Sequence, residues 1–252
     1  MTHHSEKELK WPEGDKLRPG LYIVATPIGN LRDITLRALD TLKMVDKIAC
    51  EDTRVTGKLL KAYDISKPTL TYNDHSDEKK RRDIISAIQN GQSIALVSDA
   101  GCPLISDPGF KLIRDLTKED IYVTSIPGAS AALTGLQLSG LSSDSFCFIG
   151  FLPSKQKARQ DNLKEWEAVS STLIAYETGP RLLASLKDIR DVLGERRVCV
   201  ARELTKMFEE KRSDYVFEHI AYYEVNGAPK GEIVLVIEGA KQKIWDDEQL
   251  IE

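Results

Sequence analysis

Short runs of β-branched and apolar residues alternate with helical patterns along most of the chain, and this alternation is the strongest constraint on its fold. Between the first two runs, Leu31, Ile34, Ala38, Leu42 and Val45 recur at three- and four-residue steps, which is typical of one face of a helix. Strands that alternate with helices indicate a parallel sheet with crossover helices. The strand-like runs of the first half are 21–25 (LYIVA), 47–50 (KIAC), 69–72 (TLTY), 93–98 (SIALVS) and 121–126 (IYVTSI).

A second series of strand-like runs follows Pro127 and Gly128. Its members are 145–150 (SFCFIG), 171–176 (STLIAY), 197–201 (RVCVA) and 232–239 (EIVLVIEG). The chain has 252 residues, enough for two modest domains. We therefore predict two consecutive α/β domains, over residues 19–126 and 127–240. A flexible leader, 1–18, is expected before them and a solvated acidic tail, 241–252, after them.

Composition narrows the class of protein. Apolar residues make up 41% and charged residues 29%, as in ordinary globular proteins. No apolar run approaches the roughly 20 residues that a membrane span needs, and the polar start is no signal peptide. We therefore expect a cytoplasmic protein. The net charge of −4 argues against non-specific coating of nucleic acid, although it permits a local basic patch. The cysteines form no C-x-x-C pair and predict reduced thiols rather than a metal site: Cys50, Cys102, Cys147 and Cys199.

Unusual polar residues follow the predicted strands, where ligands collect on open α/β sheets. After the first strand, Gly29 permits a tight turn and Asn30 is placed to cap the following helix. Such a helix start can hold a phosphate or carboxylate, but a plain capped turn has the same pattern.

The segment 99–109 (DAGCPLISDPG) follows the buried run 93–98 and favours a binding site over an ordinary loop. It places Asp99 and Asp107 on either side of an apolar pair, Leu104 and Ile105. A carboxylate with exposed backbone groups can hold the amino group, ribose or sulfonium edge of a ligand.

Two further strand ends carry candidate chemistry. Asp52 and Arg54, in the segment EDTR, fit either a catalytic cluster or a charged helix start. His75 lies beside Asp74 and is a plausible base or RNA contact, although a lone loop histidine is more often only solvated. The chain contains no G-x-G-x-x-G turn after the first strand, no phosphate-binding P-loop and no G-x-S-x-G elbow.

Seven segments together resemble the ribosomal RNA small subunit methyltransferase I family, which has the tetrapyrrole-methylase (class III methyltransferase) fold. The resemblance runs from about Leu21 to Gly239, with the segments in the family's order. They are 26–34 (TPIGNLRDI), 51–54 (EDTR), 97–109 (VSDAGCPLISDPG), 127–131 (PGASA), 150–155 (GFLPSK), 201–206 (ARELTK) and 230–232 (KGE).

The resemblance implies 2′-O-methylation of a cytidine ribose in the decoding region of 16S ribosomal RNA within the small subunit. It further implies S-adenosyl-L-methionine as methyl donor, a cofactor cleft between the two domains, and a homodimer. By matching position, the implied cofactor-binding residues are Pro27, Ser98, Asp99, Ala100, Gly101, Ile105, Ser130 and Ala131, with backbone near Tyr176 and Ala201.

Two departures from the family pattern stand out. Cys102 occupies a position where Thr is common, which affects a hydroxyl contact near the cofactor. The chain also ends soon after Gly239, whereas many members carry a further helical segment. The turn T-P-I-G-N differs from the G-x-G-x-G-D turn of relatives that methylate tetrapyrroles, and so points away from porphyrinoid substrates.

A methyl transfer to a ribose hydroxyl needs alignment and removal of a proton. The candidate groups for proton removal are Asp52, His75, Glu203 and Lys206, and Asn30 and Arg54 could instead orient the ribose or its phosphates. Lys206 would need a depressed pKa to act as a base. Because they lie in or directly after the segment GFLPSK, Lys155, Lys157 and Arg159 are the predicted phosphate contacts, with Phe151 nearby for stacking.

Two other functions fit the same residues. One keeps the fold and methylates a tetrapyrrole or another small molecule. The other is a non-catalytic module that binds RNA or cofactor, which the many polar residues at strand ends argue against. No metal is expected in either case.

Overall fold

The computed structural model describes residues 16–73 and 78–240, and its chain divides into two compact units between Ala129 and Ser130. The sequence placed this boundary at residues 126 and 127.

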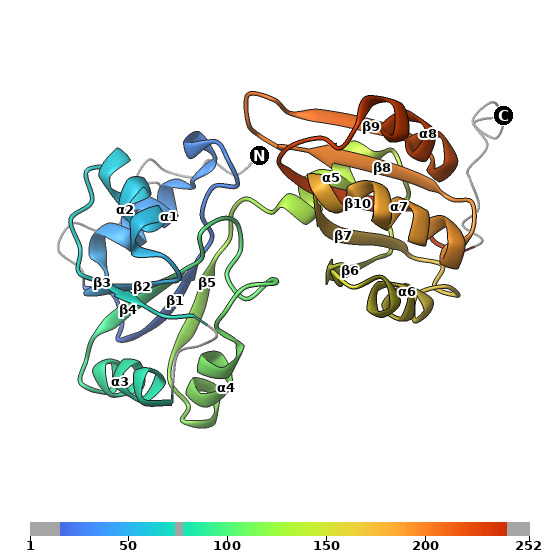
Figure 1. Ribbon diagram of the computed structural model, residues 1–252. Coiled ribbons are helices and arrows are strands. Elements are labelled where there is room, and N and C mark those ends of the chain that lie inside the picture. Colours follow the sequence, from blue (N-terminus) through green and yellow to red (C-terminus); the bar gives the residue numbers. More distant parts are fainter. Residues whose placement is uncertain (1–15, 74–77, 241–252) are drawn as a thin grey trace, which may run out of the picture. The chain divides into compact units, whose positions relative to one another are not determined.

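The first unit is a parallel sheet with helices on both faces (Figure 1). Its strands lie in the order β3-β2-β4-β1-β5, and every neighbouring pair is parallel, as predicted. The strands are β1 (Gly20–Val24), β2 (Lys47–Cys50), β3 (Thr69–Thr71), β4 (Ser93–Val97) and β5 (Val123–Ile126). The α-helices are α1 (Leu36–Met44), α2 (Thr53–Ala62), α3 (Glu78–Gln89) and α4 (Phe110–Lys118).

Apolar runs form these strands because both faces of the sheet are covered. Successive residues of β1 face opposite sides, so Leu21 packs in a cluster with residues of α3 and α4. Tyr22 and Val24 pack in a second cluster with residues of α1 and α2. The central strand β4 divides in the same way between the two clusters and is buried throughout.

The helix predicted over residues 31–45 is two elements. A 3-10 turn, η2 (Leu31–Asp33), comes first, and the Asn30 side chain accepts a hydrogen bond from the Arg32 backbone N–H at its start. Thr35 then caps α1 by accepting from the Ala38 N–H. The single helical face was therefore wrong at Leu31, whose side chain is exposed. Because Asn30 and Thr35 each cap the start of a helical element, the segment forms two short elements instead of one continuous helix.

The second unit has a mixed sheet in the order β6-β7-β10-β8-β9. Only β6 and β7 are parallel, and the other pairs are antiparallel. The edge strand β9 was not predicted because Glu210–Tyr215 is mostly charged and lacks apolar alternation. The strands are β6 (Phe146–Phe151), β7 (Thr172–Thr178), β8 (Arg197–Arg202), β9 (Glu210–Tyr215) and β10 (Glu232–Ile237).

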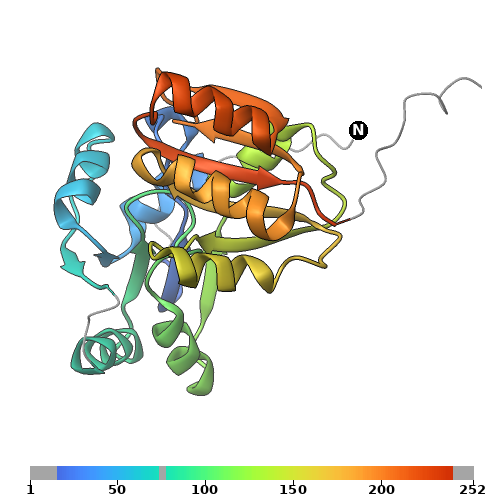
Figure 2. The ribbon, with the colours of Figure 1, turned by 45° about the vertical axis from the view of Figure 1, so that its right-hand side comes forward.

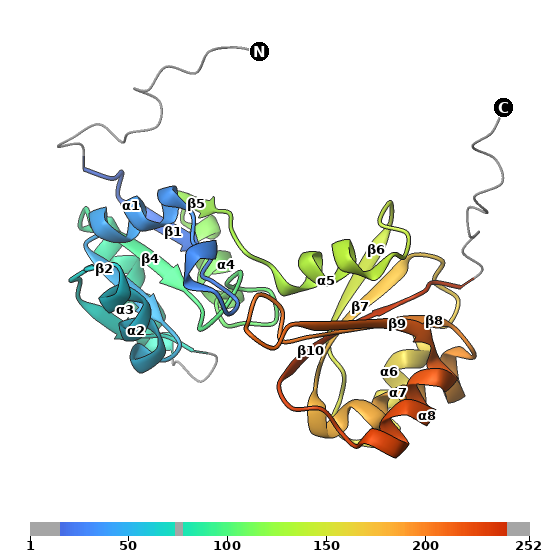
Figure 3. The same ribbon diagram turned by 90° about the horizontal axis from the view of Figure 1, so that it is seen from above.

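Helices cover both faces of this sheet unequally. The helices α6 (Gln156–Lys164), α7 (Gly179–Leu193) and α8 (Val216–Asn226) lie side by side on one face, with α7 in the middle (Figure 2). Of the described helices, only α5 (Ala131–Ser139) lies on the other face (Figure 3). Strand β10 packs against the helices of both faces, because Ile233 and Leu235 pack beneath α7 while Val234 approaches α5. Among the described helices, none is long and apolar enough to span a membrane.

Two helical glycines give opposite predictions for stability. A Cβ at Gly135 of α5 would lie 2.7 Å from Val234 Cγ1, so Gly135→Ala should lower the free energy of unfolding by about 1–3 kcal/mol. Gly57 of α2 has open space around it, so Gly57→Ala should raise that free energy by about 0.5–1 kcal/mol. Urea unfolding followed by circular dichroism measures both. A stabilised Gly135→Ala variant would contradict the close packing of α5 on β10.

Candidate active site at the strand ends

The loops that follow β1 and β4 meet at the point where the sheet's connections diverge. From β1 the chain crosses toward β2, and from β4 it crosses the opposite way toward β5. Ligands of open α/β sheets bind in the crevice that such a switch point opens. Here Thr26 and Gly101 exchange backbone hydrogen bonds of 2.8 and 3.0 Å, and the Thr26 hydroxyl donates to the Ser98 carbonyl. The two loops are thus joined as one short antiparallel bridge.

Neighbouring loops are attached to the same bridge. The Asp99 carboxylate accepts a hydrogen bond from the Asp52 backbone N–H at 3.2 Å, which joins the loops after β4 and β2. The Cys102 thiol donates to the Ala129 carbonyl at 3.4 Å, which joins the loop after β4 to the segment after β5. Burial raises the pKa of the Cys102 thiol, with Asp107 adding to the effect, so this group stays neutral and a donor. The cysteine therefore makes the kind of polar contact that a Thr hydroxyl would make.

The loop after β4 has an unusual backbone. Gly101, Leu104, Ser106 and Gly109 all have positive φ, at +77°, +72°, +63° and +135°. Two of these residues carry side chains, for which the left-handed region is unfavourable. A Cβ on Gly101 would lie 3.3 Å from Ile28 Cγ2, so glycine keeps the loop close to the turn after β1. Strain of this kind is typical of ligand-binding loops.

The predicted cofactor residues of the first unit line this bridge. Ser98 is buried, and its hydroxyl donates to the Ala100 carbonyl, while Asp99 and Ala100 are exposed. Ile105 presents an apolar side chain that is 47% exposed. An exposed carboxylate beside accessible backbone and an exposed apolar surface fits a ligand that combines a positive charge with a flat ring. Pro27, half-buried, follows the bridging Thr26.

Asp52 is used as a helix cap. It accepts from the Arg54 backbone N–H at 2.8 Å at the start of α2, and its carboxylate pairs with the Arg54 guanidinium at 2.6 Å. These contacts lower the pKa of Asp52 to about 2, so its carboxylate is a weak base. Arg54 is otherwise exposed to solvent, and Asn30 is exposed at the start of η2.

Lys206 is the centre of an ion-pair cluster in the second unit. Its ammonium contacts Glu203 Oε1 at 2.9 Å and Glu232 Oε2 at 2.6 Å. Burial opposes its charge, but the hydrogen bonds to Glu232 and Glu203 outweigh it and raise the pKa of Lys206. A backbone hydrogen bond from Glu232 and the contact with Lys206 lower the pKa of Glu203. Both shifts make the group a poorer base near neutral pH, so they disfavour Glu203 and Lys206 for proton removal, and the assignment of that role stays a prediction. Glu232 was not singled out, although it stands in the segment KGE.

The other predicted cofactor residues of the second unit lie on α5, β7 and β8. Ser130 caps α5, and Ala131 is its first residue. Tyr176 of β7 packs edge-on against Phe148 and Phe151. Ala201 of β8 is fully buried and pairs with Val234 of β10 and Lys211 of β9.

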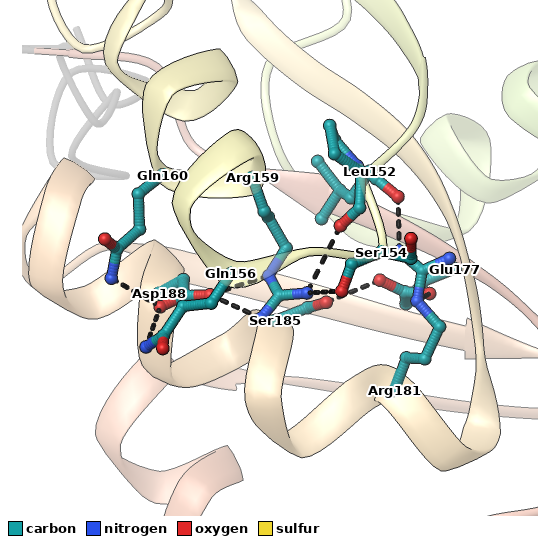
Figure 4. Close-up of polar contacts among 10 residues, drawn as sticks. Leu152, Ser154, Gln156, Arg159, Gln160, Glu177, Arg181, Ser185 and Asp188 are labelled. Carbon is teal, nitrogen blue, oxygen red and sulfur yellow. Dashed lines mark hydrogen bonds and ion pairs between the residues drawn. The ribbon is translucent and has the colours of Figure 1, made fainter.

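Of the three predicted phosphate contacts, one is wrong. Lys155 and Lys157 are exposed on the start of α6. The Arg159 side chain is only 4% exposed, and its guanidinium pairs with Asp188 of α7 at 2.5 Å (Figure 4). A guanidinium held by a buried carboxylate cannot reach a phosphate. His75 lies outside the described residues. Within the described ranges no group of three or more His, Cys, Asp or Glu residues could hold a metal.

Comparison with known proteins identifies the fold and the family. Residues 20–215 match the family described as Tetrapyrrole (Corrin/Porphyrin) Methylases. The uroporphyrin-III-C-methyltransferase of Thermus thermophilus superimposes with a TM-score of 0.61 over 87% of this chain and 94% of that one, at 18% identity. At this identity the likeness shows the fold, a two-unit α/β methyltransferase of the tetrapyrrole-methylase class.

Much closer relatives share one name, ribosomal RNA small subunit methyltransferase I. That of Erythrobacter litoralis is 56% identical over 92% of this chain and 82% of its own length. That of Escherichia coli O157:H7 is 51% identical over the same shares. The chain therefore belongs to the ribosomal RNA small subunit methyltransferase I family, whose methyl donor is S-adenosyl-L-methionine. It is an S-adenosylmethionine-dependent methyltransferase.

The Asp52–Arg54 pair gives a prediction for acid titration. In the intact protein the Asp52 carboxyl should titrate near pH 2, and Arg54→Ala should move it up toward its ordinary 3.8. Because the folded-state pKa is the lower one, the stabilisation by this pair is present above pH 4 and is lost as the pH falls toward 2. Titration of the carboxyl carbon by NMR measures the shift. An unchanged pKa in Arg54→Ala would show that the pair does not form in solution.

Proposed function

We propose that this enzyme methylates the 2′-oxygen of a cytidine ribose in the decoding region of 16S ribosomal RNA, as part of the small subunit. The observation that carries the proposal is the bridged, strained edge of the first unit, with its exposed Asp99 carboxylate, in a chain about half identical to enzymes named for that RNA. We place the enzyme in the cytoplasm, where its substrate is assembled. The homodimer and the cofactor cleft between the domains stay predictions from the family resemblance.

The residues of the strand ends have distinct roles in this proposal. When bound, S-adenosylmethionine supplies an electrophilic methyl group on a positively charged sulfur. Asp99 would hold positive charge on the cofactor, and the exposed apolar side chain of Ile105 would offer a surface for its ring. Gly101, which has no side chain, lets this loop lie close to Ile28 in the turn after β1 and so keeps the two loops together. Ser130 and Ala131 at the start of α5, with backbone near Tyr176 and Ala201, complete the predicted set.

Proton removal from the ribose hydroxyl needs a group with a pKa near neutrality. Three of the four candidates have pKa values shifted the wrong way: Asp52, Glu203 and Lys206. We propose His75, whose ordinary pKa is about 6.5, as the base. The Lys206 ammonium and the Arg54 guanidinium remain charged and are suited to orienting the ribose and its phosphates.

Contact with RNA is proposed at the start of α6, where Lys155 and Lys157 are exposed. Lys157 pairs with Asp161 at 2.7 Å on the helix surface, an exposed contact of little energy that a phosphate can replace. Phe151, 55% exposed beside Tyr176, offers a ring on which a base can stack.

Methyl transfer to isolated small subunits tests the proposed substrate. Labelled S-adenosylmethionine is incubated with the enzyme and subunits from a strain that lacks the endogenous activity, and the RNA is digested to nucleosides. The label should appear in 2′-O-methylcytidine. Label confined to another nucleoside, or absent from RNA while the cofactor binds, would reject the proposal. In the latter case tetrapyrroles and other small acceptors are the alternative on this fold.

Two substitutions separate the base from a residue that only carries charge. His75→Gln should lower kcat by about 100-fold or more, as expected for loss of a general base. Lys206→Arg keeps the cation beside Glu203 and Glu232, and kcat should stay within about threefold of the wild type. Single-turnover rates on small subunits measure both. The reverse order, with Lys206→Arg inactive and His75→Gln active, would make Lys206 the base.

A further inference from the structure

A buried arginine holds the segment that precedes α6. The guanidinium of Arg159 donates to Asp188 Oδ2 at 2.7 Å through Nε, and to the carbonyls of Pro153 and Ser154, each at 3.2 Å, through Nη1 (Figure 4). Arg159 thus ties the turn before α6 to helix α7. Lysine, with one nitrogen, cannot make this set of contacts.

The carboxylate of Asp188 is fixed in turn by α6. Its Oδ1 accepts from Gln160 Nε2 at 2.8 Å and from Gln156 Nε2 at 3.3 Å, and the side chain is 1% exposed. A buried charge pair is stable only when its remaining hydrogen-bonding capacity is met, and both glutamines serve that purpose. Among the described residues, the Asp188 carboxylate contacts Gln156, Arg159 and Gln160, all on α6, the helix that carries Lys157.

A second arginine holds the same segment one residue earlier. Arg181 of α7 donates to the Leu152 carbonyl and pairs with Glu177 Oε1 at 3.2 Å. Leu152 also donates its N–H to the Tyr176 carbonyl at 3.3 Å. Three successive carbonyls, those of Leu152, Pro153 and Ser154, are therefore bound by two guanidinium groups.

The exposed groups of this segment stand in contrast to its bound backbone. Phe151 precedes the three carbonyls and Lys155 follows them, and both side chains are exposed. Because Arg159 and Arg181 hydrogen-bond the carbonyls of residues 152–154, the backbone between Phe151 and Lys155 is fixed. The two exposed side chains therefore start from a fixed separation on the surface. The Arg159–Asp188 pair joins α6 to α7, and the Arg181–Glu177 pair joins α7 to β7. These two ion pairs are more than packing requires, because apolar side chains of the same volume stabilise such contacts as well or better.

We propose that Arg159 and Arg181 are positioning residues for RNA binding, which act by fixing the backbone of residues 152–154 between Phe151 and Lys155. The inference rests on the proposed function, in that Lys155 contacts a phosphate of the RNA. It makes Arg159 and Arg181 determinants of affinity for RNA although neither touches it. A flexible segment would lose part of its binding free energy to ordering.

Steady-state kinetics with small ribosomal subunits test the proposal. Arg159→Lys and Arg181→Lys should each raise the KM for subunits about three- to tenfold, while kcat and the KM for S-adenosylmethionine stay at wild-type values. Arg190→Lys, on the same helix but exposed and paired with its neighbour Asp191, is the matched control and should change nothing. Arg181 is 30% exposed, so its substitution is the safer one for folding.

A double-mutant cycle with Lys155→Ala separates positioning from a structural role. If the arginines act through the segment, Arg159→Lys should raise the KM for subunits less than about twofold further in the Lys155→Ala background. A merely structural role would lower the fraction of active enzyme, and so kcat, and would leave the KM for subunits unchanged. That result, or full additivity with Lys155→Ala, would overturn the inference. Failure of the proposed function is distinct, because the wild-type enzyme itself would then not methylate the subunits.

Discussion

The exchanged backbone hydrogen bonds between Thr26 and Gly101 are the constraint on which the candidate site depends. They join the turn after β1 to the loop after β4 at the point where the sheet opens. The other contacts extend from this bridge, through Asp99 to the loop after β2 and through Cys102 to the segment after β5. Four loops from different parts of the sequence are thereby held as one surface, and the positive φ values of the loop after β4 are maintained by it.

In the second unit, ion pairs take the place of the backbone bridge of the first unit. Its sheet is built from antiparallel pairs around β10, and the segments around Lys206 and before α6 are held by charged side chains rather than by backbone bridges. Lys206 draws Glu203 and Glu232 together, and Glu203 has a positive φ of +51° at that point. The Arg159–Asp188 pair does the same for the turn before α6. In both places a cation that the sequence suggested for chemistry is engaged in holding the chain.

The sequence was informative where burial sets the pattern. Strands buried on both faces read as short apolar runs, so β1, β2 and β4 were predicted within one residue at each end. The edge strand β9 escaped notice because its charged residues need no apolar partner layer. The short 3-10 turn at Leu31 was missed because its capping by Asn30 competes with helix propagation, which periodicity does not record.

The same contrast holds for the site residues: local composition indicated some of them, and only the tertiary fold determined the others. The loop 99–109 could be singled out because its composition suits no ordinary turn. The pairing of Arg159 with Asp188 and of Lys206 with Glu232 could not, because each joins residues about 30 positions apart that only the tertiary fold brings together. A cation in a sequence segment looks the same whether it will meet a phosphate or a buried carboxylate.

Binding of S-adenosylmethionine, measured by isothermal titration calorimetry, tests the central claim most directly, namely that the bridged edge of the first unit holds the cofactor. Asp99→Asn should raise the Kd about tenfold or more, through loss of a charged contact, while leaving the fold intact. Asp144→Asn, at an exposed aspartate between α5 and β6, should leave the Kd unchanged. An Asp99→Asn variant that binds the cofactor as tightly as the wild type would contradict the account.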